Sequence, residues 1–525
     1  MARRLSRPGR TAFPRKPTRR ADARPVDIRR KTDVTLAAES SAGVDLTAAT
    51  LDRAFVGGQW LTADSGADIA VTDPATGERI GSVPRMGRAE TLAAIEAAHA
   101  AWGPWRALTA SERSAVLRRW AGLVYLHQDR LAELLTAEQG KPLAESRAEI
   151  GASAGFLTWF AEEGRRAYGR TIPTDRADRR LSVIRQPVGV VAAITPWNFP
   201  SSMITRKAGP ALAAGCTMVV KPSEETPLSA LALARLAEEA GVPAGVFNVV
   251  TGSAREIGGA LTDSPLVRKL TFTGSTPVGK LLAEQSAATV KRVSLELGGN
   301  APFIVCDDAD LDAAVAGAIG SKFRNAGQAC VATNRIYVQD GIHDRFVETF
   351  TARVREFVIG NGAAPGTEVG PMINPGAAAA MSALLDDAVG GGARIVTGGA
   401  PHPHGAAFFA PTVLVDAADD MDCCRAETFG PIAPIMRFGE DTEVIRRANA
   451  TPYGLVAYCY TTHYRRLNRF AEELDFGMVG MNDFSVSTEV APFGGVKESG
   501  IGREGAQDGL DEYTEVKYVC TGGMS

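Results

Sequence analysis

Apolar and polar positions alternate along the chain in runs that predict short strands and helices. Strands are expected at residues 54–56 and 69–71, with turn residues between them. Thr109-Ala-Ser-Glu112 is a capping box ahead of a run with helical spacing, and Gly140-Lys141-Pro142 is expected to end the next helix. The first part of the chain is therefore predicted to mix strands and helices.

From residue 188 onward the pattern predicts a regular alternation of strands and helices. The helix that begins with Thr226-Pro227 and ends at Gly241 has the residues preferred at helix starts and ends. Strands alternating with helices are typical of a doubly wound parallel sheet. The expected strands are residues 188–194, 217–220, 247–250, 270–273 and 293–295, with a further helix at 203–214.

A second α/β unit is expected after Gly299, beginning with an apolar strand at residues 302–305 and ending near residue 493. Within it, residues 307–310 (Asp-Asp-Ala-Asp) lack the glycine and the final glutamate of a calcium loop, so they predict a helix N-cap. None of the six histidines falls in a metal-ligand pattern, and no metal is expected. The predicted fold is α/β, with two doubly wound parallel-sheet domains.

Length, composition and charge are those of an ordinary globular protein. The chain has 525 residues, enough for two or three domains, with 45% hydrophobic and 22% charged residues. A net charge of −3 gives no sign of a nucleic-acid or membrane partner, and the longest apolar run, residues 188–194, is too short to span a bilayer. Seven cysteines without a framework spacing favour a reducing, cytoplasmic location.

The N-terminal residues differ sharply from the rest in charge. Between Arg3 and Lys31 there are twelve Arg or Lys residues, and the only acids are Asp22 and Asp27. So few large apolar residues cannot form a core, and residues 1–50 are predicted to be a disordered basic tail. The alternative is a transit peptide, which is also rich in Arg and poor in acids, although no clear amphipathic stripe is present.

Three residues far apart in the sequence supply the parts of a site that oxidises a carbonyl. Cys330 follows the small-residue run Gly-Gln-Ala, Glu296 ends an apolar strand, and Asn198 lies in the turn Pro-Trp-Asn-Phe-Pro. Oxidation through a thioester needs an attacking thiol, a base and a donor for the developing oxyanion. Taken singly, each residue has a structural alternative: a core cysteine, a salt-bridged carboxylate and a turn asparagine.

A candidate nucleotide site follows the strand at residues 270–273. Gly274 allows close backbone approach there, and Ser275 with the next helix N-terminus can bind a phosphate. The common G-x-G-x-x-G fingerprint is absent from the start of the alternating region. Lys221 and Glu224 follow another strand at the same sheet edge, where open α/β sheets bind their ligands.

Taken together, these segments resemble the aldehyde dehydrogenase superfamily, and within it most closely the succinate-semialdehyde dehydrogenases. The resemblance runs from about Phe55 to the C-terminus. It implies oxidation of succinate semialdehyde to succinate with NAD(P), as in GABA degradation, or of another ω-carboxy aldehyde such as glutarate semialdehyde. A non-catalytic protein on this fold is the remaining alternative, against which the intact Cys330, Glu296 and Asn198 argue. The matching segments are TPWNFPSSMITRKAGPALAAGC, VSLELGGNAPFIVCDDADLD, SKFRNAGQAC, ETFGP and APFGGVKESGIGREG.

The resemblance also implies a role for individual residues. Cys330 would be the nucleophile, Glu296 the base that activates water, and Asn198 an oxyanion donor together with the backbone N–H of Cys330. The implied substrate contacts, which would hold a second carboxylate, are Arg206, Arg324 and Ser487. The implied cofactor residues are Trp197, Lys221, Glu224, Gly274, Ser275, Glu427 and Phe429.

Two positions depart from the family pattern. Asp483-Phe484-Ser485-Val486 stands where the family usually has a small glycine and aliphatic residues, which puts the preferred substrate length in doubt. Ala332 stands where many relatives carry a second cysteine. NAD is expected to be preferred, because the Glu224 carboxylate would repel a 2′-phosphate, but NADP is not excluded, because Lys221 nearby would partly offset that repulsion.

The resemblance implies three parts and a homodimer or homotetramer. The dinucleotide-binding domain would comprise residues 51–168 and 188–297, and the catalytic domain residues 298–505. A small β oligomerisation arm and tail would comprise residues 169–187 and 506–525. Their strands would otherwise leave unpaired edges in water.

Overall fold

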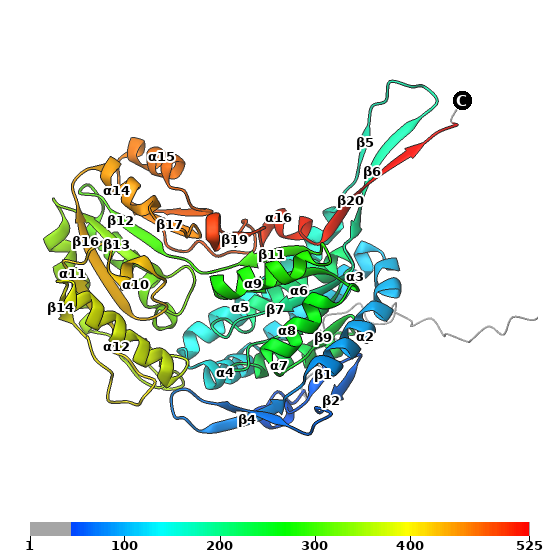
Figure 1. The fold of residues 1–525 in the computed structure, drawn as a ribbon, viewed down its shortest axis with the longest axis horizontal. Helices are drawn as coiled ribbons and strands as arrows, with labels where there is room; N and C mark the ends of the chain where they lie inside the picture. Colours follow the sequence, from blue (N-terminus) through cyan, green and yellow to red (C-terminus); the bar gives the residue numbers. More distant parts are fainter. Residues whose placement is uncertain (1–43, 524–525) are drawn as a thin grey trace, which may run out of the picture. The chain divides into compact units, whose positions relative to one another are not determined.

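The computed structural model describes residues 44–523, in which two large sheets are each covered by helices on both faces (Figure 1). The strands of the first sheet are β1 (Ala54–Val56), β2 (Gln59–Leu61), β7 (Val190–Ile194), β8 (Thr217–Lys221), β9 (Phe247–Val249), β10 (Val267–Thr273), β11 (Arg292–Glu296) and β19 (Gly500–Ile501). They lie in the order β19-β11-β10-β7-β8-β9-β1-β2. From β7 the chain builds β8 and β9 on one side and β10 and β11 on the other, so the strand order reverses between β7 and β10. The central five strands are parallel, as predicted.

Alternate residues of β7 explain why the first sheet is covered on both faces. Val191 and Ala193 pack into one core with α3, α5, α6 and α7, whereas Val190 and Ala192 pack into another with α2, α8 and α9. All four side chains are buried, as expected for a parallel strand with helices on both faces. The helices are α2 (Arg88–Ala107), α3 (Ala110–Leu126), α4 (Gln128–Gln139), α5 (Leu143–Glu163), α6 (Ser202–Ala214), α7 (Leu228–Glu239), α8 (Ala254–Asp263) and α9 (Thr276–Ala287).

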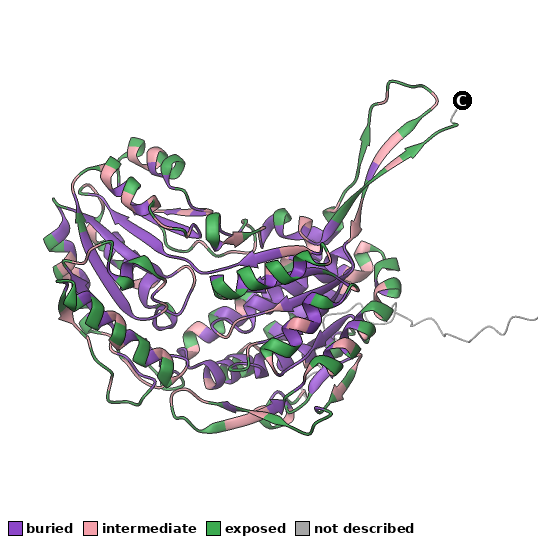
Figure 2. Cartoon of the chain, viewed as in Figure 1, coloured by how far each residue is buried: buried purple, intermediate pink, exposed green. Residues whose placement is uncertain are grey.

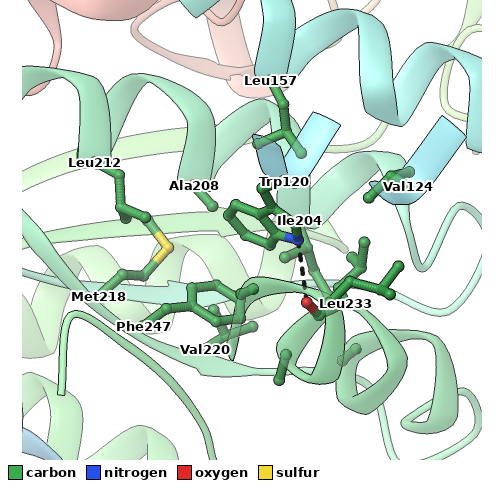
Figure 3. Packing of buried hydrophobic residues seen from close by; sticks show 14 of the residues in the cluster. Trp120, Val124, Leu157, Ile204, Ala208, Leu212, Met218, Val220, Leu233 and Phe247 are labelled. Carbon is green, nitrogen blue, oxygen red and sulfur yellow. Dashed lines mark hydrogen bonds between the residues drawn. The ribbon is translucent and has the colours of Figure 1, made fainter. Parts of the chain in front are cut away.

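The core on the α6 side is centred on a buried tryptophan (Figure 3). The Trp120 ring meets Phe247 edge-on, with the ring centroids 5.1 Å apart, and its Nε1 donates to the Leu233 carbonyl oxygen at 3.1 Å. The indole is therefore packed without an unpaired donor. Because Trp120 comes from α3 and Phe247 from β9, this core joins the N-terminal helices to the sheet that carries the candidate site.

The second sheet is also doubly wound. Its order is β14-β15-β16-β13-β12-β17-β18, and only β14 is antiparallel to its neighbour. Helices α10 and α11 cover one face, and α12 to α15 cover the other. The strands are β12 (Ala301–Val305), β13 (Thr333–Gln339), β14 (Arg394–Thr397), β15 (Thr412–Val415), β16 (Ile432–Phe438), β17 (Val456–Tyr460) and β18 (Met478–Met481). The helices are α10 (Leu311–Phe323), α11 (His343–Arg355), α12 (Pro375–Gly390), α13 (Asp422–Arg425), α14 (Asp441–Asn449) and α15 (Tyr464–Glu473).

A third, antiparallel sheet joins distant parts of the chain. Its strands β5 (Arg170–Ile172), β6 (Arg180–Pro187) and β20 (Thr514–Thr521) lie in the order β20-β6-β5, and the sheet extends away from the two large ones (Figure 1). Most of its residues are exposed, in contrast to the large sheets (Figure 2). The helix α16 (Ala506–Asp511) leads into β20, and β3 (Asp68–Thr72) and β4 (Arg79–Pro84) form a separate hairpin.

Most local predictions are confirmed. Thr109 and Glu112 form the capping box of α3, Gly140 ends α4 in a left-handed conformation with φ 94°, and Asp310 caps α10 through the Ala313 N–H. Pro227 is the residue before α7 rather than its first residue, and Gly241 follows that helix with φ 80°.

Two predicted boundaries need correction. Residues 1–43 of the predicted tail lie outside the described residues, but residues 44–50 belong to the fold, because Leu46 is buried in the first core. The segment assigned to the second domain, residues 298–505, includes β19, which pairs antiparallel with β11 of the first sheet. The chain therefore returns to the first sheet before it reaches the arm.

Three further findings bear on function. No helix in residues 44–523 is both long and apolar enough to cross a bilayer. In the same residues, no group of three or more His, Cys, Asp or Glu side chains could hold a metal ion. All seven cysteines are free, and Cys330 and Cys520 are the two that are not fully buried.

Candidate active site

The candidate site lies where the carboxyl edge of the first sheet meets the amino edge of the second. Asn198 follows β7, Glu296 is the last residue of β11, and Cys330 precedes β13. Only Leu297 to Asn300 separate β11 from β12, which joins the two edges closely. Ligands of doubly wound sheets bind at this edge, next to the reversal of strand order.

Two glycines in this short link bring the site residues together. A methyl group on Gly298 would lie 2.6 Å from a carboxylate oxygen of Glu427, and one on Gly299 would lie 2.3 Å from the carbonyl oxygen of Cys330. The N–H of Gly299 also donates to Glu427 at 3.2 Å. Neither glycine could therefore carry a side chain without moving Glu427 or Cys330.

The surroundings of Cys330 disfavour the thiolate form of its side chain. Burial raises the pKa of the thiol to about 12, the carboxyl groups of Glu427 and Glu296 add to this, and the Arg206 guanidinium opposes it. Both Glu296 and Arg206 therefore lie close enough to act on the sulfur, although their charges have opposite effects.

Glu296 is a buried carboxyl with unused hydrogen-bonding capacity. Burial, and then the neighbouring Glu504 carboxylate, raise the pKa of Glu296 well above its ordinary value, against the charges of Arg206, Lys207 and Arg503. Its Oε2 is buried and has no hydrogen-bond partner among residues 44–523. A carboxyl with a raised pKa has the basicity that proton abstraction near neutral pH requires.

Glu504 differs from Glu296 in being paired. It is held by Lys207, which also donates to the Thr273 hydroxyl at 2.7 Å, and it lies 2.8 Å from the Nε of Arg206. These two cations hold the pKa of Glu504 below its ordinary value despite its burial. Two carboxyl groups side by side thus have opposite pKa shifts.

The turn before Cys330 has an uncommon backbone. Asn325, Ala326 and Gly327 have φ of 51°, 54° and 78° in succession, a left-handed conformation that costs free energy at the two residues that are not glycine. The Asn325 side chain donates to the backbone oxygens of Asn198 and Gln328, at 3.1 and 3.3 Å. The turn is therefore tied directly to Asn198.

Asn198 is fixed by the same turn. Its Nδ2 donates to the Gln328 carbonyl oxygen at 3.0 Å, which orients the amide, and its Oδ1 is buried without a partner among the described residues. Gln328 is itself held by the Ile373 N–H at 2.9 Å. The structure thus joins two of the predicted residues, Asn198 and Cys330, through a backbone contact two residues before the cysteine.

The predicted cofactor residues line the edge of the first sheet. Lys221 is the last residue of β8, and its Nζ lies 3.7 Å from Glu224, whose carboxylate also accepts from the Ala254 N–H at 2.9 Å. Gly274 packs on the Phe272 ring, where a methyl group would lie 2.4 Å from a ring carbon. Ser275 is exposed before α9 and makes no side-chain capping bond.

Two aromatic rings and a buried glutamate lie on the side of the second sheet. The rings of Trp197 and Phe429 meet edge-on, with centroids 5.4 Å apart. Burial raises the pKa of Glu427 to about 8, against its hydrogen bond from Gly299 and the charge of Lys322. An exposed hydroxyl before a helix N-terminus, a flanking Lys–Glu pair and an aromatic pair fit the phosphate, ribose and ring of a dinucleotide.

The three predicted substrate contacts have different surroundings. Arg324 is exposed, has no hydrogen bond or ion pair within residues 44–523, and places its guanidinium 5.0 Å from the Phe199 ring centre. Ser487 is also exposed. Arg206 is buried: it lies 4.2 Å from the Phe493 ring centre and is paired with Glu504. Its Nε and Nη2 form no hydrogen bond among the residues described, although the Nε lies 2.8 Å from Glu504 in an ion pair.

Tyr458 lies near both Cys330 and Arg324. Its hydroxyl donates to the Val331 carbonyl oxygen at 2.8 Å, one residue after the cysteine. Burial raises the pKa of Tyr458, nearby Cys330 and Asp483 add to this, and Arg324 opposes it. Asp483, from the loop that departs from the family pattern, therefore also lies near Tyr458.

The architecture is that of two doubly wound sheets, with Asn198, Glu296 and Cys330 gathered where their edges meet. Residues 60–519 match the Aldehyde dehydrogenase family, and the chain belongs to this family of NAD(P)-dependent enzymes.

Individual relatives cover nearly the whole chain. It is 58% identical to a glutarate-semialdehyde dehydrogenase of Pseudomonas aeruginosa, over 90% of this chain and 98% of that protein. It is also 58% identical to the succinate-semialdehyde dehydrogenase [NADP(+)] GabD of Escherichia coli, over the same shares. A crystal structure of succinate-semialdehyde dehydrogenase from Burkholderia pseudomallei matches with a TM-score of 0.89 and 55% identity, over 90% of this chain and 98% of that one. The predicted family and fold are thereby confirmed.

Several residues of the site carry no recognisable sequence signal of their own. In the sequence, Lys141 is part of a predicted helix end, and Glu504 stands in the matched segment GIGREG, where nothing singles it out. Gln328 and Asn325 stand beside the cysteine in the segment SKFRNAGQAC, where the sequence marks Gln328 only as a neighbour of the sulfur. Their roles depend on contacts with residues distant in the sequence, from 57 positions for Lys141 and Asn198 to 297 for Lys207 and Glu504.

Proposed function

We propose that this enzyme oxidises succinate semialdehyde to succinate, with Cys330 as the nucleophile. The observation that carries the proposal is the exposed guanidinium of Arg324, which has no hydrogen bond or ion pair within residues 44–523 and, like Cys330, lies near Tyr458. An unpaired arginine is suited to bind the distal carboxylate of a short aldehyde acid. The names of the two relatives that are 58% identical to this chain support a substrate of this class.

The first step is attack by the Cys330 sulfur on the aldehyde carbon, while the thiol proton passes to Glu296 and from there to water; this gives a thiohemiacetal. The negative charge that develops on oxygen is stabilised by the Asn198 amide and the N–H of Cys330, each such donor contributing about 2.7–4 kcal/mol. When bound, the oxidised nicotinamide supplies a positive charge and accepts the hydride. Loss of that hydride leaves a thioester on Cys330.

Hydrolysis of the thioester is the second half of the reaction. Glu296 removes a proton from water, the hydroxide attacks the acyl carbon, and the Cys330 sulfur leaves as succinate forms. The raised pKa of Glu296 supports this role, since its carboxylate is basic enough to activate water. A glutamate at this position favours a free acid as the product rather than acyl transfer to coenzyme A.

The substrate carboxylate is bound by Arg324 and Ser487, with the unpartnered Nη2 of Arg206 as a third donor. Phe484, half-exposed, packs against Gly320, where a methyl group would lie 2.5 Å from its ring. This ring occupies room that smaller residues would leave open. Glutarate semialdehyde, longer by one methylene group, is the second candidate substrate.

The cofactor, assembly and location complete the proposal. NAD would bind along Trp197, Lys221, Glu224, Gly274, Ser275, Glu427 and Phe429.

The enzyme forms a homodimer or homotetramer through the arm, where Val516 and Tyr518 are exposed on the edge strand β20. The free cysteines favour a cytoplasmic location. No nucleic acid or membrane takes part.

A panel of aldehydes, read by the absorbance of reduced nicotinamide, tests the proposal. Succinate semialdehyde should give the highest kcat/KM, ahead of glutarate semialdehyde and butanal. Cys330→Ala should abolish oxidation of all three and leave cofactor binding intact. If this variant kept a tenth of the wild-type turnover, the assignment of Cys330 as the nucleophile would be wrong. If butanal were the best substrate, the assignment of Arg324, Ser487 and Arg206 as contacts to a substrate carboxylate would be wrong.

A further inference from the structure

Behind the turn of Asn198 lies a buried ion pair that no step of the reaction uses. Lys141 and Glu149 are joined at 2.7 Å, and their side chains are 0% and 1% exposed. They come from the link between α4 and α5 and from α5 itself. A buried ion pair is weak evidence for stability, because replacing both members by neutral residues is often harmless or favourable.

Each member of the pair also forms hydrogen bonds with the segment that carries Asn198. The Nζ of Lys141 donates to the backbone oxygen of Asn198 at 2.6 Å. The Oε1 of Glu149 accepts from the N–H groups of Ser201 and Ser202 at 2.9 and 3.1 Å, at the start of α6. The pair thus holds both ends of the five-residue turn from Asn198 to Ser202.

The same scaffold also holds the turn before Cys330. Gln139, two residues before Lys141, donates to the Asn325 Oδ1 at 3.0 Å and accepts from the Lys141 N–H at 3.1 Å. Glu145, four residues after Lys141 and in the first turn of α5, accepts from the Asn325 N–H at 2.9 Å. These contacts hold Asn325 in its left-handed conformation, which directs the chain towards Cys330.

The two halves of the oxyanion site therefore meet at one backbone oxygen. The oxygen of Asn198 accepts both from Lys141 and from the Asn325 side chain, and the Asn198 side chain returns a hydrogen bond to Gln328. Since Asn198 and the N–H of Cys330 must converge on one substrate oxygen, a small rotation of either would weaken both.

We propose that Lys141, neutralised by Glu149, is a positioning residue that aligns Asn198 with the N–H of Cys330 for oxyanion binding. This inference rests on the oxyanion role given to Asn198 in the proposed function. Lys141 itself touches no reacting atom. Because a displacement of catalytic groups by about 1 Å can cost about 100-fold in rate, loss of this alignment should lower activity about 10- to 100-fold.

The test is a neutral replacement of the whole pair, Lys141→Met with Glu149→Gln, which keeps side-chain length and leaves no unpaired charge. With the aldehyde that the wild type oxidises best, kcat should fall about 10- to 100-fold. The KM, the cofactor affinity and the circular dichroism spectrum should stay as in the wild type. A folded double variant with wild-type kcat would overturn the proposal.

A matched control is available on the same helix. Arg147 and Asp129 form an exposed ion pair at 2.8 Å, so Arg147→Met with Asp129→Asn repeats the chemical change away from the turn. Its kcat should equal that of the wild type. If the Lys141 double variant does not fold, Glu149→Gln alone gives the second measurement: lower kcat at constant KM is expected, and an unchanged kcat overturns the proposal.

A double-mutant cycle with Asn198→Ala separates positioning from other effects. Asn198→Ala alone should lower kcat about 100- to 1,000-fold. Adding the Lys141 and Glu149 changes to it should cost no more than about twofold further, because their effect acts through Asn198. A full additional loss in that background would refute the inference. If Asn198→Ala itself kept full activity, the oxyanion role in the proposed function would fail instead.

Discussion

Two buried polar clusters flank Cys330, and they differ in how completely their atoms are paired. The scaffold cluster consists of Gln139, Lys141, Glu149, Asn325 and Gln328, and it is linked by hydrogen bonds of 2.6–3.3 Å. The base cluster consists of Glu296, Glu504, Arg206, Lys207 and Arg503, and there the Oε2 of Glu296 has no partner among residues 44–523.

The difference in pairing means that one cluster is suited to fix the positions of side chains and the other to change its protonation state. A fully paired buried group has a fixed position and a fixed charge, since every alternative leaves a polar atom unsatisfied. A buried carboxyl with a free oxygen, such as Glu296, can gain or lose a proton without breaking a bond to its neighbours. In the proposed function, the scaffold cluster fixes positions and the base cluster exchanges protons, so the two tasks fall to different groups of residues.

The largest expected effect is on the rate of thioester hydrolysis, and it comes from replacing Glu296 in the base cluster. Glu296→Gln keeps the shape but removes the base, so thioester hydrolysis should slow by about 10²- to 10⁴-fold. Hydride transfer should still give one burst of reduced cofactor, because it precedes hydrolysis. Mass spectrometry of the intact protein should then detect an acyl-enzyme.

The double variant Cys330→Ala with Glu296→Gln is the control for the accumulation of the acyl-enzyme. It should show neither a burst nor an added mass, because the acyl group is carried by the sulfur. A burst from Glu296→Gln with an unmodified protein mass would contradict the assignment of Glu296 as the hydrolytic base.

The two arginines extend the same comparison to substrate binding. Arg324→Ala should lower kcat/KM for succinate semialdehyde about 10- to 100-fold, since a charge-assisted hydrogen bond contributes about 1.5–3 kcal/mol, and should leave butanal unaffected. Arg206→Ala should harm both aldehydes, because it also removes the ion pair with Glu504. Equal losses on both aldehydes for Arg324→Ala would mean that Arg324 is structural.

Much of the fold could be predicted because its signals are local. The capping box at Thr109 and Glu112 and the N-cap at Asp310 depend on neighbours three residues away, and both are confirmed. The parallel sheet follows from apolar strands such as β7, whose buried run predicts helices on both faces. The return of β19 to β11 could not be read in this way, since a two-residue strand has no periodicity.

The site was predictable only where chemistry marks a residue. Cys330 and Glu296 are unusual in their surroundings, and the structure brings them close enough for Glu296 to affect the pKa of Cys330. Lys141 resembles any lysine near a helix end, yet it is fully buried against Asn198, 57 positions away in sequence. The pairing of Arg206 with Glu504 likewise joins positions 206 and 504, and no spacing rule links them.

A smaller effect concerns stability and pH. The pKa of Glu296 is raised in the folded protein, so the folded state holds its proton more tightly than the unfolded chain does. Stability from this group is complete below the ordinary glutamate value of 4.5 and is lost as pH rises towards the raised value. Glu296→Gln, which cannot ionise, should therefore gain stability relative to the wild type with increasing pH.

Urea unfolding of the two proteins from about pH 5 to about pH 9 measures this difference. Glu504→Gln is the matched comparison, because the pKa of Glu504 is lowered and its cations would lose their partner. That variant should be less stable than the wild type across the range. A constant difference between Glu296→Gln and the wild type would show that Glu296 keeps its ordinary pKa.

The smallest expected effect concerns the choice between NAD and NADP. It depends on Glu224, which is more exposed than the members of either cluster but is still paired. Glu224 is half-exposed but held by the Ala254 N–H at 2.9 Å and by Lys221 at 3.7 Å. Its carboxylate can accept from the 2′-hydroxyl of NAD and would repel a 2′-phosphate by about 1 kcal/mol in water-like surroundings. Glu224→Ser should therefore shift the ratio of kcat/KM values towards NADP by about fivefold. Lys221→Met should shift it the other way, since the ammonium offsets that repulsion. If the wild type already used NADP better than NAD, Lys221 and not Glu224 would be the stronger determinant of cofactor preference.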